Sequence, residues 1–507
     1  MQGQVVHLQC GPCVRRDYET LATLARTSRV FHEPALDILW SYQADLSNLV
    51  KCFPSDSWIE IPGVDGAPTS LTFMRPLLPI DFTRFDQYAF RVRELCFKPF
   101  RKGVPVMYPS VELLRSLILY LPSRPLLPNL RAIVWDHGPI GNGAFPFCQL
   151  FLGANIKIMS WRSTNPASDL VVAYALLQQQ QLSPCAHRIS MELLSFPDIL
   201  VKAPGVLNGF KELRSFSCIS PAPLPYELFG HLAQLPRLYR LLLSSRGDDL
   251  VILPKDPAPP IAFPALMHLS VSAVSIKACA ALLTATTFPS ITNLRVTAYH
   301  TNTISPLLEA IQKQCSHVTL ESLTISGLKP PGTAAPASTA PLACLHAFCS
   351  LRELTLDTLE RPLALDDDAL RGMALAWPQL GSLNLIGTRS RGAQTAVTLD
   401  ALVTLVRHCP HLVTLQIPLS AAHTQMTPGR RPGGGYVNGN IQSLHLDASS
   451  AGDAAEVAAF LSDLFPNLRM IRPYVTGEPS LDWKLLEKLL PTFAAVRTQE
   501  RTPLEDE

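Results

Sequence analysis

The chain has 507 residues, of which 47% are hydrophobic and 17% are charged. Its formal net charge of +2 comes from nearly balanced acids and bases, which argues against a nucleic-acid-binding protein. No stretch approaches the roughly 18 apolar residues of a membrane span, and the opening MQGQVVHLQC lacks the basic and apolar regions of a signal peptide. We therefore expect no nucleic-acid or membrane partner. The 12 scattered cysteines indicate free thiols and a cytoplasmic or nuclear location.

The first motif in chain order is Cys10-Gly-Pro-Cys13, which has the spacing of a thiol redox pair. The thioredoxin fold needs a strand and a helix ahead of this motif, and only nine residues precede it. A zinc site would need two more ligands, and no second pair is suitably spaced. We therefore predict no metal and no cofactor. A thiol redox protein using Cys10 and Cys13 stays open as a remote alternative.

Apolar residues at helical spacing predict two short helices after this motif. Leu21 and Leu24 mark the apolar face of the first helix, and Leu36 and Trp40 mark that of the second. The segment 1–58 is therefore expected to form a small helical head with apolar faces of its own.

The run LARTSRVFHEPALDILW, from Leu24 to Trp40, resembles the F-box region of the large F-box protein family of mushroom-forming (basidiomycete) fungi. Other stretches similar to this family are DLSNLVKCFP from Asp45, RFDQYAFRVRELCF from Arg84 and the C-terminal residues around Trp483. F-boxes usually open with a Leu-Pro-x-Glu-like start, and MQGQVVHLQCGPCVRRDYE stands in that place here. We therefore expect a truncated or degenerate F-box start.

The resemblance implies that the head docks onto a Skp-type adaptor and, through it, onto a cullin. The chain would then be the substrate-recognition subunit of a cullin-based (SCF-type) ubiquitin ligase, binding a target protein elsewhere on its surface. The adaptor-binding residues that the resemblance implies are Leu21, Leu24, Phe31, Leu36 and Trp40.

A transitional segment is expected over residues 59–109, followed by a repeat solenoid over residues 110–507. The apolar spacing of the repeat strands is clear at Leu130–Trp135 and becomes irregular between residues 136 and 212. The elements expected before the regular repeats are a strand-like unit at Arg84–Cys96, a helix at Ser110–Leu121, a strand at Leu130–Trp135, a strand at Asn155–Trp161, a helix at Ser168–Gln180 and a strand at His187–Leu194.

A six-residue pattern, apolar at positions one, four and six, recurs through the rest of the chain. Neighbouring copies lie about 25–32 residues apart, the period of repeat solenoids. Positions three to six alternate as in a short strand with one buried face, so positions three and five point outward. Helical stretches such as Ala369–Ala376 and Leu399–His408 separate the copies. The copies are LRSFSC from Leu213, LYRLLL from Leu238, LMHLSV from Leu266, ITNLRV from Ile291, LESLTI from Leu320, LRELTL from Leu351, LGSLNL from Leu380, LVTLQI from Leu412, IQSLHL from Ile441 and LRMIRP from Leu468.

A single strand of this kind cannot bury its apolar face, whereas stacked copies share one core. Strands that run in one direction and are joined by helical crossovers form a parallel sheet. The sequence therefore predicts an α/β fold, a leucine-rich-repeat solenoid with a curved parallel sheet and helices on its convex side. Flexible insertions rich in proline, alanine or glycine are expected near residues 253–263, 327–341 and 421–440.

The outward positions of the strands form a long surface suited to protein recognition. No Gly-x-Ser-x-Gly, His-Glu-x-x-His or dinucleotide fingerprint is present, so we expect no enzymatic activity. The alternative to a ligase subunit is a non-catalytic repeat scaffold for protein–protein interaction. The predicted partner contacts on the concave face are Arg240, His268, Asn293, Arg295, Glu353, Asn384, Gln416 and His445.

Overall fold

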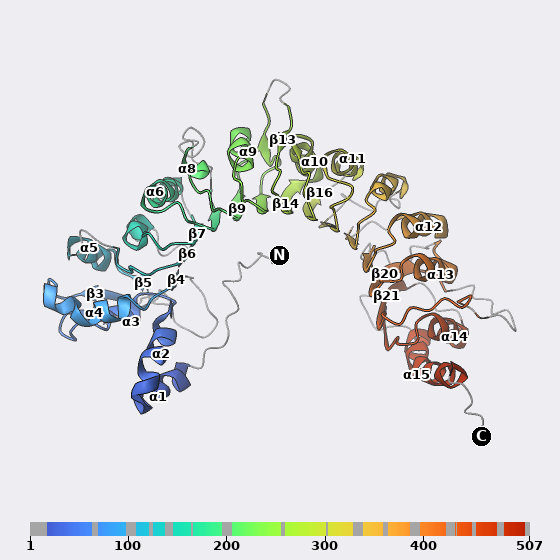
Figure 1. Ribbon diagram of the computed structural model, residues 1–507, viewed down its shortest axis with the longest axis horizontal. Coiled ribbons are helices and arrows are strands. Elements are labelled where there is room, and N and C mark those ends of the chain that lie inside the picture. Colours follow the sequence, from blue (N-terminus) through green and yellow to red (C-terminus); the bar gives the residue numbers. More distant parts are fainter. Residues whose placement is uncertain are drawn as a thin grey trace. The chain divides into compact units, whose positions relative to one another are not determined.

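A computed structural model of the chain is drawn in Figure 1. The chain divides into two compact units, Met1–Leu213 (unit 1) and Arg214–Glu507 (unit 2). The structure describes residues 18–62, 69–97, 108–120, 125–136, 145–163, 166–194, 205–254, 259–300, 303–327, 338–357, 363–385, 396–421, 431, 433–448, 453–473 and 481–501.

Each unit is built around a parallel sheet whose strands follow one another in chain order. The strands of the unit 1 sheet are β1 (Tyr42–Gln43), β4 (Glu94–Phe97), β6 (Ala132–Asp136), β7 (Ile158–Arg162) and β8 (Arg188–Glu192). The strands of the unit 2 sheet are β9 (Ser215–Ser220), β11 (Arg240–Ser245), β14 (His268–Ser275), β16 (Asn293–His300), β17 (Ser322–Ser326), β18 (Glu353–Leu356), β19 (Ser382–Asn384), β20 (Thr414–Leu419), β21 (Ser443–Ala448) and β22 (Met470–Pro473).

Helices connect most pairs of successive strands and cover one face of each sheet (Figure 1). Over the described ranges, no helix combines the length and the apolar character needed to cross a bilayer. The helices of unit 1 are α1 (Tyr18–Thr27), α2 (Arg29–Trp40), α3 (Ser47–Val50), η1 (Pro79–Asp81), α4 (Phe82–Ala89), α5 (Val111–Tyr120), η2 (Phe145–Phe151), α6 (Pro166–Leu182) and α8 (Gly205–Asn208). The helices of unit 2 are α9 (Tyr226–Ala233), α10 (Ile276–Thr284), α11 (Ser305–Gln314), η3 (Ala340–Ala347), α12 (Asp367–Ala376), α13 (Leu399–His408), α14 (Ala454–Leu464) and α15 (Leu481–Arg501).

The six-residue pattern produces the stacking that it predicts. In the copy LRELTL, Leu351 and Leu354 are fully buried, whereas Glu353 is exposed. The third residue of a copy donates its main-chain N–H to the carbonyl of the second residue of the preceding copy, as from Arg240 to Arg214 at 3.0 Å. Burying one leucine side chain contributes about 1.5–3 kcal/mol to the stability of the fold. Each further copy of the pattern therefore adds stability along the sheet. The fold is therefore an α/β leucine-rich-repeat solenoid, as predicted.

Capping side chains set where the helices of unit 2 begin. The Asp366 carboxylate accepts the N–H of Ala369 at 2.8 Å, which satisfies one free donor in the first turn of α12. Asp367 accepts the N–H and the hydroxyl of Thr398 at 2.8 and 2.6 Å. Thr398 is in turn the cap of α13, so these side chains couple the starts of two consecutive helices. The helices predicted at Ala369–Ala376 and Leu399–His408 are confirmed.

The region before the regular repeats holds structure that the sequence pattern did not predict. β1 pairs in parallel with β4, so the repeat sheet begins at Tyr42, inside the segment assigned to the head. The strand-like unit expected at Arg84–Cys96 is a helix followed by a strand. Phe82, Phe85 and Ala89 are spaced three and four residues apart and all are buried, which is the pattern of a helix with one apolar face.

Three smaller sheets accompany the repeat strands. In unit 1, β2 (Trp58–Ile61) is antiparallel to β3 (Ser70–Phe73), which pairs with β5 (Tyr108–Pro109). In unit 2, parallel pairs join β10 (Leu224–Pro225) to β12 (Val251–Ile252) and β13 (Ile261–Ala262) to β15 (Thr286–Thr287).

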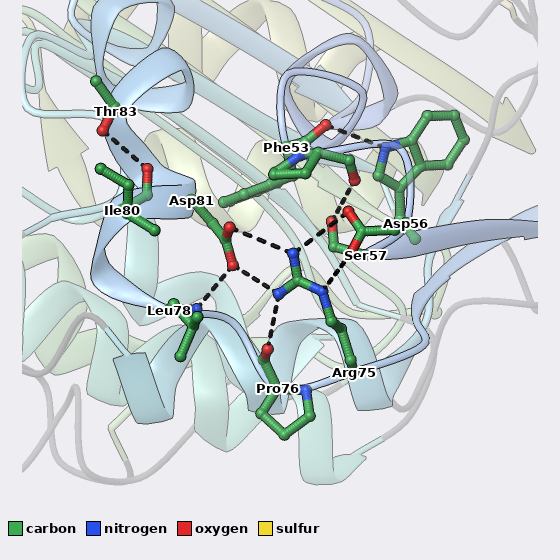
Figure 2. Close-up of polar contacts among 11 residues, drawn as sticks. Phe53, Asp56, Ser57, Arg75, Pro76, Leu78, Ile80, Asp81 and Thr83 are labelled. Carbon is green, nitrogen blue, oxygen red and sulfur yellow. Dashed lines mark hydrogen bonds and ion pairs between the residues drawn. The ribbon is translucent and has the colours of Figure 1, made fainter.

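A single arginine ties the turn before α4 to the loop before β2 (Figure 2). The Arg75 guanidinium donates to the carboxylates of Asp56 at 2.8 Å and Asp81 at 2.7 Å. Asp81 is buried and also accepts the N–H of Leu78 at 2.8 Å. These hydrogen bonds hold the pKa of Asp56 and that of Asp81 below their usual values. The cluster therefore fixes the chain path that leads into the repeat sheet.

Part of the predicted insertion at 421–440 is packed against its neighbours. The Asn438 side chain is buried; its amide donates to the carbonyl of Leu412 at 2.9 Å and its oxygen accepts the N–H of Ile441 at 3.1 Å. Gly434 and Gly435 precede it with φ of +60° and +89°, a conformation that favours glycine. The glycine run is thus the turn that brings Asn438 into the core. In the predicted insertion at 253–263, only residues 255–258 lie outside the described residues, and Ile261–Ala262 forms the paired strand β13. Most of the predicted insertion at 327–341 lies outside the described residues.

Candidate protein-interaction surfaces

The first candidate surface is the hairpin formed by α1 and α2. The Ser28 hydroxyl caps α2 by accepting the N–H of Val30 at 3.3 Å. His32 Nδ1 lies 2.7 Å from the carbonyl oxygen of Ala25, which links the two helices directly. The hairpin core consists of Ala25, Ala35 and Leu36, with Leu21, Leu39, Trp40 and Tyr88 packed against it.

Two contacts attach the hairpin to the rest of unit 1. The Trp40 ring stacks on the Tyr88 ring of α4, with 4.2 Å between their centroids. The Arg91 guanidinium bridges Glu33, at 2.5 Å, and Asp37 on α2. This hydrogen bond from Arg91 holds the pKa of Glu33 below its usual value. The hairpin is therefore held in a defined orientation on unit 1.

The five residues implied as adaptor contacts fall into two groups. Leu36 is buried, and Leu21 and Trp40 are half-buried in the hairpin core. Leu24 and Phe31 instead expose 37% and 53% of their surface. The buried and half-buried residues form the hairpin core, whereas Leu24 and Phe31 are accessible to a partner protein.

Two further apolar residues of the head are exposed and were not singled out from the sequence. Val30 exposes 77% and Ile38 47% of its surface. Ile38 lies seven residues after Phe31, so both are on the same side of α2. The seven-residue spacing of Phe31 and Ile38 is visible in the sequence. However, apolar residues occur on every side of this helix, so the sequence does not show which of them are exposed and which are buried. We refer to Leu24, Val30, Phe31 and Ile38 as the head patch.

The second candidate surface is the inner face of unit 2, meaning the face of its sheet opposite the helices (Figure 1). The pairing register brings the eight predicted partner contacts into two adjacent rows, and all eight are exposed or half-exposed. Neighbouring strands in such rows are about 4.8 Å apart. The third-position row contains Arg240, His268, Asn293 and Glu353, and the fifth-position row contains Arg295, Asn384, Gln416 and His445.

This inner face is polar and carries its charges in separate places. Arg240 and Arg295 are basic, whereas Glu353 is acidic and accepts a hydrogen bond from the Ser322 hydroxyl at 2.9 Å. Burial and then the charge of Arg240 lower the pKa of His268, which keeps its ring neutral at pH 7. Small hydroxyl side chains fill most of the remaining row positions: Ser215, Ser217, Ser270, Thr324, Thr355, Ser382, Thr414 and Ser443. Such a face offers many hydrogen bonds and little apolar surface.

The third candidate surface is the inner face of unit 1, and it is apolar at its centre. Its third-position row runs Tyr42, Glu94, Ala132, Ile158 and Arg188, and its fifth-position row runs Cys96, Val134, Ser160 and Ser190. These residues, together with Leu95, line a hollow of about 60 Å³, which we call the unit 1 pocket. Within the described part of the chain, the side chains of Glu94 and Arg188 have no ionic or hydrogen-bonding partner.

Sequence reasoning missed the unit 1 pocket although the repeat pattern extends into it. The stretches Val92–Phe97, Ile156–Trp161 and Ala186–Met191 all have apolar residues at positions one, four and six. Two of them begin with valine or alanine in place of leucine or isoleucine, and the spacing between them is uneven. Their third and fifth positions give the pocket residues once the register is recognised.

No group of three or more metal-ligating side chains occurs among the residues that the structure describes. Cys10 and Cys13, the proposed redox pair, lie outside those residues. The cysteines that are described are free, and most of them are buried. Burial raises the pKa of Cys148, Cys279 and Cys315 to about 12, so these thiols are protonated and poorly nucleophilic at neutral pH.

No protein-family model matches the sequence, and no curated protein matches it. Three similar solved structures are the Rad7 and Elc1 complex of yeast, the mouse RP105/MD-1 complex and the Toll–Spatzle complex of Drosophila. Their sequence identities are 15%, 17% and 13%, and their TM-scores are 0.35, 0.38 and 0.31. The matches cover 65%, 76% and 82% of this chain, and 77%, 59% and 64% of the yeast, mouse and Drosophila chains. The chain thus spans less than two thirds of the mouse and Drosophila chains, and at this level of similarity function is not carried over.

Proposed function

We propose that this protein is the substrate-recognition subunit of a cullin-based ubiquitin ligase. The head patch docks onto a Skp-type adaptor, and the inner face of the solenoid holds a target protein. The protein contributes proximity to the complex and no chemistry of its own. This proposal assigns separate partners to separate surfaces of the chain.

The observation that carries the proposal is the head patch. Val30 and Phe31 expose more than half of their surface on a hairpin of only two helices. Several exposed apolar side chains on one small hairpin favour a surface that another protein covers. The hairpin is also fixed to unit 1 through Arg91 and through the stacking of Trp40 on Tyr88. A rigid attachment suits a subunit that must hold its target at a set position relative to the adaptor.

Co-purification of the full chain with a Skp-type adaptor and a cullin tests the proposal. The wild-type chain is expected to retain the adaptor in stoichiometric amounts. Phe31→Asp and Ile38→Asp place a charge in the apolar contact, so each should lower adaptor recovery at least about tenfold, as expected for a desolvated anchor residue. Leu119→Asp is the matched control because Leu119 is also a helical residue and is 75% exposed, on α5.

These results decide between a ligase subunit and a non-catalytic scaffold. If the wild-type chain recovers no adaptor, or if Phe31→Asp recovers as much as the Leu119→Asp control, the ligase assignment is wrong. The polar rows on the inner face of unit 2 would then favour the second candidate function, a non-catalytic scaffold for protein–protein interaction. Equal thermal melting of the variants shows that loss of adaptor is not loss of fold.

A further inference from the structure

We propose that the unit 1 pocket binds an extended segment of the target protein that carries a cation, an apolar residue and an anion at alternate positions. This inference rests on the target-binding half of the proposed function and names the chemistry that the target must offer. The argument uses the composition of the two inner faces, the placement of two charges and the size of the hollow.

Among the residues that the structure describes, packing within the solenoid does not account for the apolar floor of the unit 1 pocket. The core of unit 1 lies on the other side of the sheet, where Ile133, Met159 and Ile189 are fully buried. Ala132 and Ile158 point to the inner face instead, at positions that the unit 2 strands fill mostly with polar side chains. An apolar centre within an otherwise polar face is typical of the anchor point of a protein interface.

Two charges of opposite sign stand at the ends of this apolar row. Glu94 is on β4 and Arg188 is on β8, with Ala132 of β6 and Ile158 of β7 between them. Three strand spacings separate the charged residues, which is about 14 Å. Neither charge is neutralised by a described residue, so a ligand with complementary charges gains both interactions without breaking an existing ion pair.

An extended peptide that crosses the strands matches this spacing. It advances about 3.3 Å per residue, so residues i and i+4 are about 13 Å apart. Residues i, i+2 and i+4 also point to the same side of an extended chain. A cation at one end therefore reaches Glu94, an anion at the other reaches Arg188, and the residue at i+2 lies over the pocket.

The size of the hollow limits the central residue. Its volume of about 60 Å³ is several times the roughly 10–15 Å³ that accommodates one water molecule. This space suits a branched aliphatic side chain such as leucine or valine. The recognised pattern is thus Lys/Arg-x-Leu/Val-x-Asp/Glu, in either chain direction.

Fluorescence anisotropy of the full chain with labelled peptides tests the inference. The probes are Gly-Lys-Ala-Leu-Ala-Asp-Gly and Gly-Asp-Ala-Leu-Ala-Asp-Gly. The wild-type chain should bind the first peptide about fivefold or more tightly than the second, because only the first pairs with Glu94. Glu94→Arg should invert this preference, and Ile158→Asp should abolish binding of both peptides. Glu112→Arg, which alters an exposed glutamate on α5, is the control that keeps the wild-type preference.

Several outcomes overturn the inference. One is that the wild-type chain binds neither peptide at millimolar concentration. Another is that Glu94→Arg leaves the preference unchanged, a result that stays decisive even if Ile158→Asp does not fold. Equal affinity for both peptides in the wild-type chain would mean that the hollow takes an isolated apolar group. Adaptor recovery, measured on the same Glu94→Arg chain, keeps the two proposals separate, because Glu94 is not a residue of the head patch.

Discussion

Gln179 of α6 and Gly153 exchange a reciprocal pair of hydrogen bonds. The side-chain amide of Gln179 donates to the carbonyl of Gly153 at 2.9 Å, and the N–H of Gly153 donates to the side-chain oxygen at 3.3 Å. Gln179 is fully buried, and Gly153 lies in the connection that leads into β7. One side chain therefore satisfies two buried main-chain groups of the preceding repeat.

Gln179→Ala is expected to lower the free energy of unfolding by about 1–3 kcal/mol, because it leaves these main-chain groups without partners in a buried place. The measurement is the midpoint of chemical denaturation of the full chain. Gln178→Ala is the matched control, since Gln178 is the adjacent residue of the same helix and is exposed. Equal midpoints for the two variants would mean that water replaces the lost hydrogen bonds.

The Arg75 cluster predicts a specific dependence of stability on pH. Hydrogen bonds from Arg75 depress the pKa of Asp56 and that of Asp81 in the folded protein. A group whose pKa is lower folded than unfolded contributes stability above its unfolded pKa of about 3.9, and this contribution is lost as the pH falls through the folded value. Arg75→Gln should therefore lower stability at pH 7 and weaken its dependence on pH below about pH 4.

Thermal melting of the wild type and Arg75→Gln from pH 7 to pH 3 checks this prediction. The difference in melting temperature between them should shrink as the carboxylates become protonated. Arg115→Gln, an exposed position on α5, serves as the control and should melt like the wild type across the series. A difference that stays constant down to pH 3 would contradict the role assigned to the two carboxylates.

The cysteines should differ sharply in reactivity. Because burial raises the pKa of Cys148, Cys279 and Cys315 to about 12, only about one thiol in ten thousand is a thiolate at pH 8. Iodoacetamide should therefore modify the exposed Cys185 and Cys349 before these three buried cysteines in the native protein. Peptide mapping by mass spectrometry measures the order, and labelling in denaturant is the control in which all five react. Early modification of Cys148 would show that unit 1 opens locally.

Residues that are close in sequence determined the repeat. Leu354 and Leu356 alternate with the polar Glu353 and Thr355, and this alternation specifies which side of a strand is buried without reference to the rest of the chain. The start of α12 at Asp366 is also set locally, since capping acts within one helical turn. The eight predicted contacts on unit 2 also fall in their expected rows because the register repeats from copy to copy.

Only the tertiary structure decided which apolar residues of the head are core and which are surface. Both helices of the hairpin are apolar on more than one side. Packing against Tyr88 half-buries Trp40 and leaves Phe31 exposed. The unit 1 pocket likewise depends on the tertiary structure. Glu94 and Arg188 are far apart in the chain, and strand pairing through β6 and β7 places them in one row. Sequence alternation sets the direction of a side chain, but its neighbours come from the stacking of strands that lie far apart in the chain.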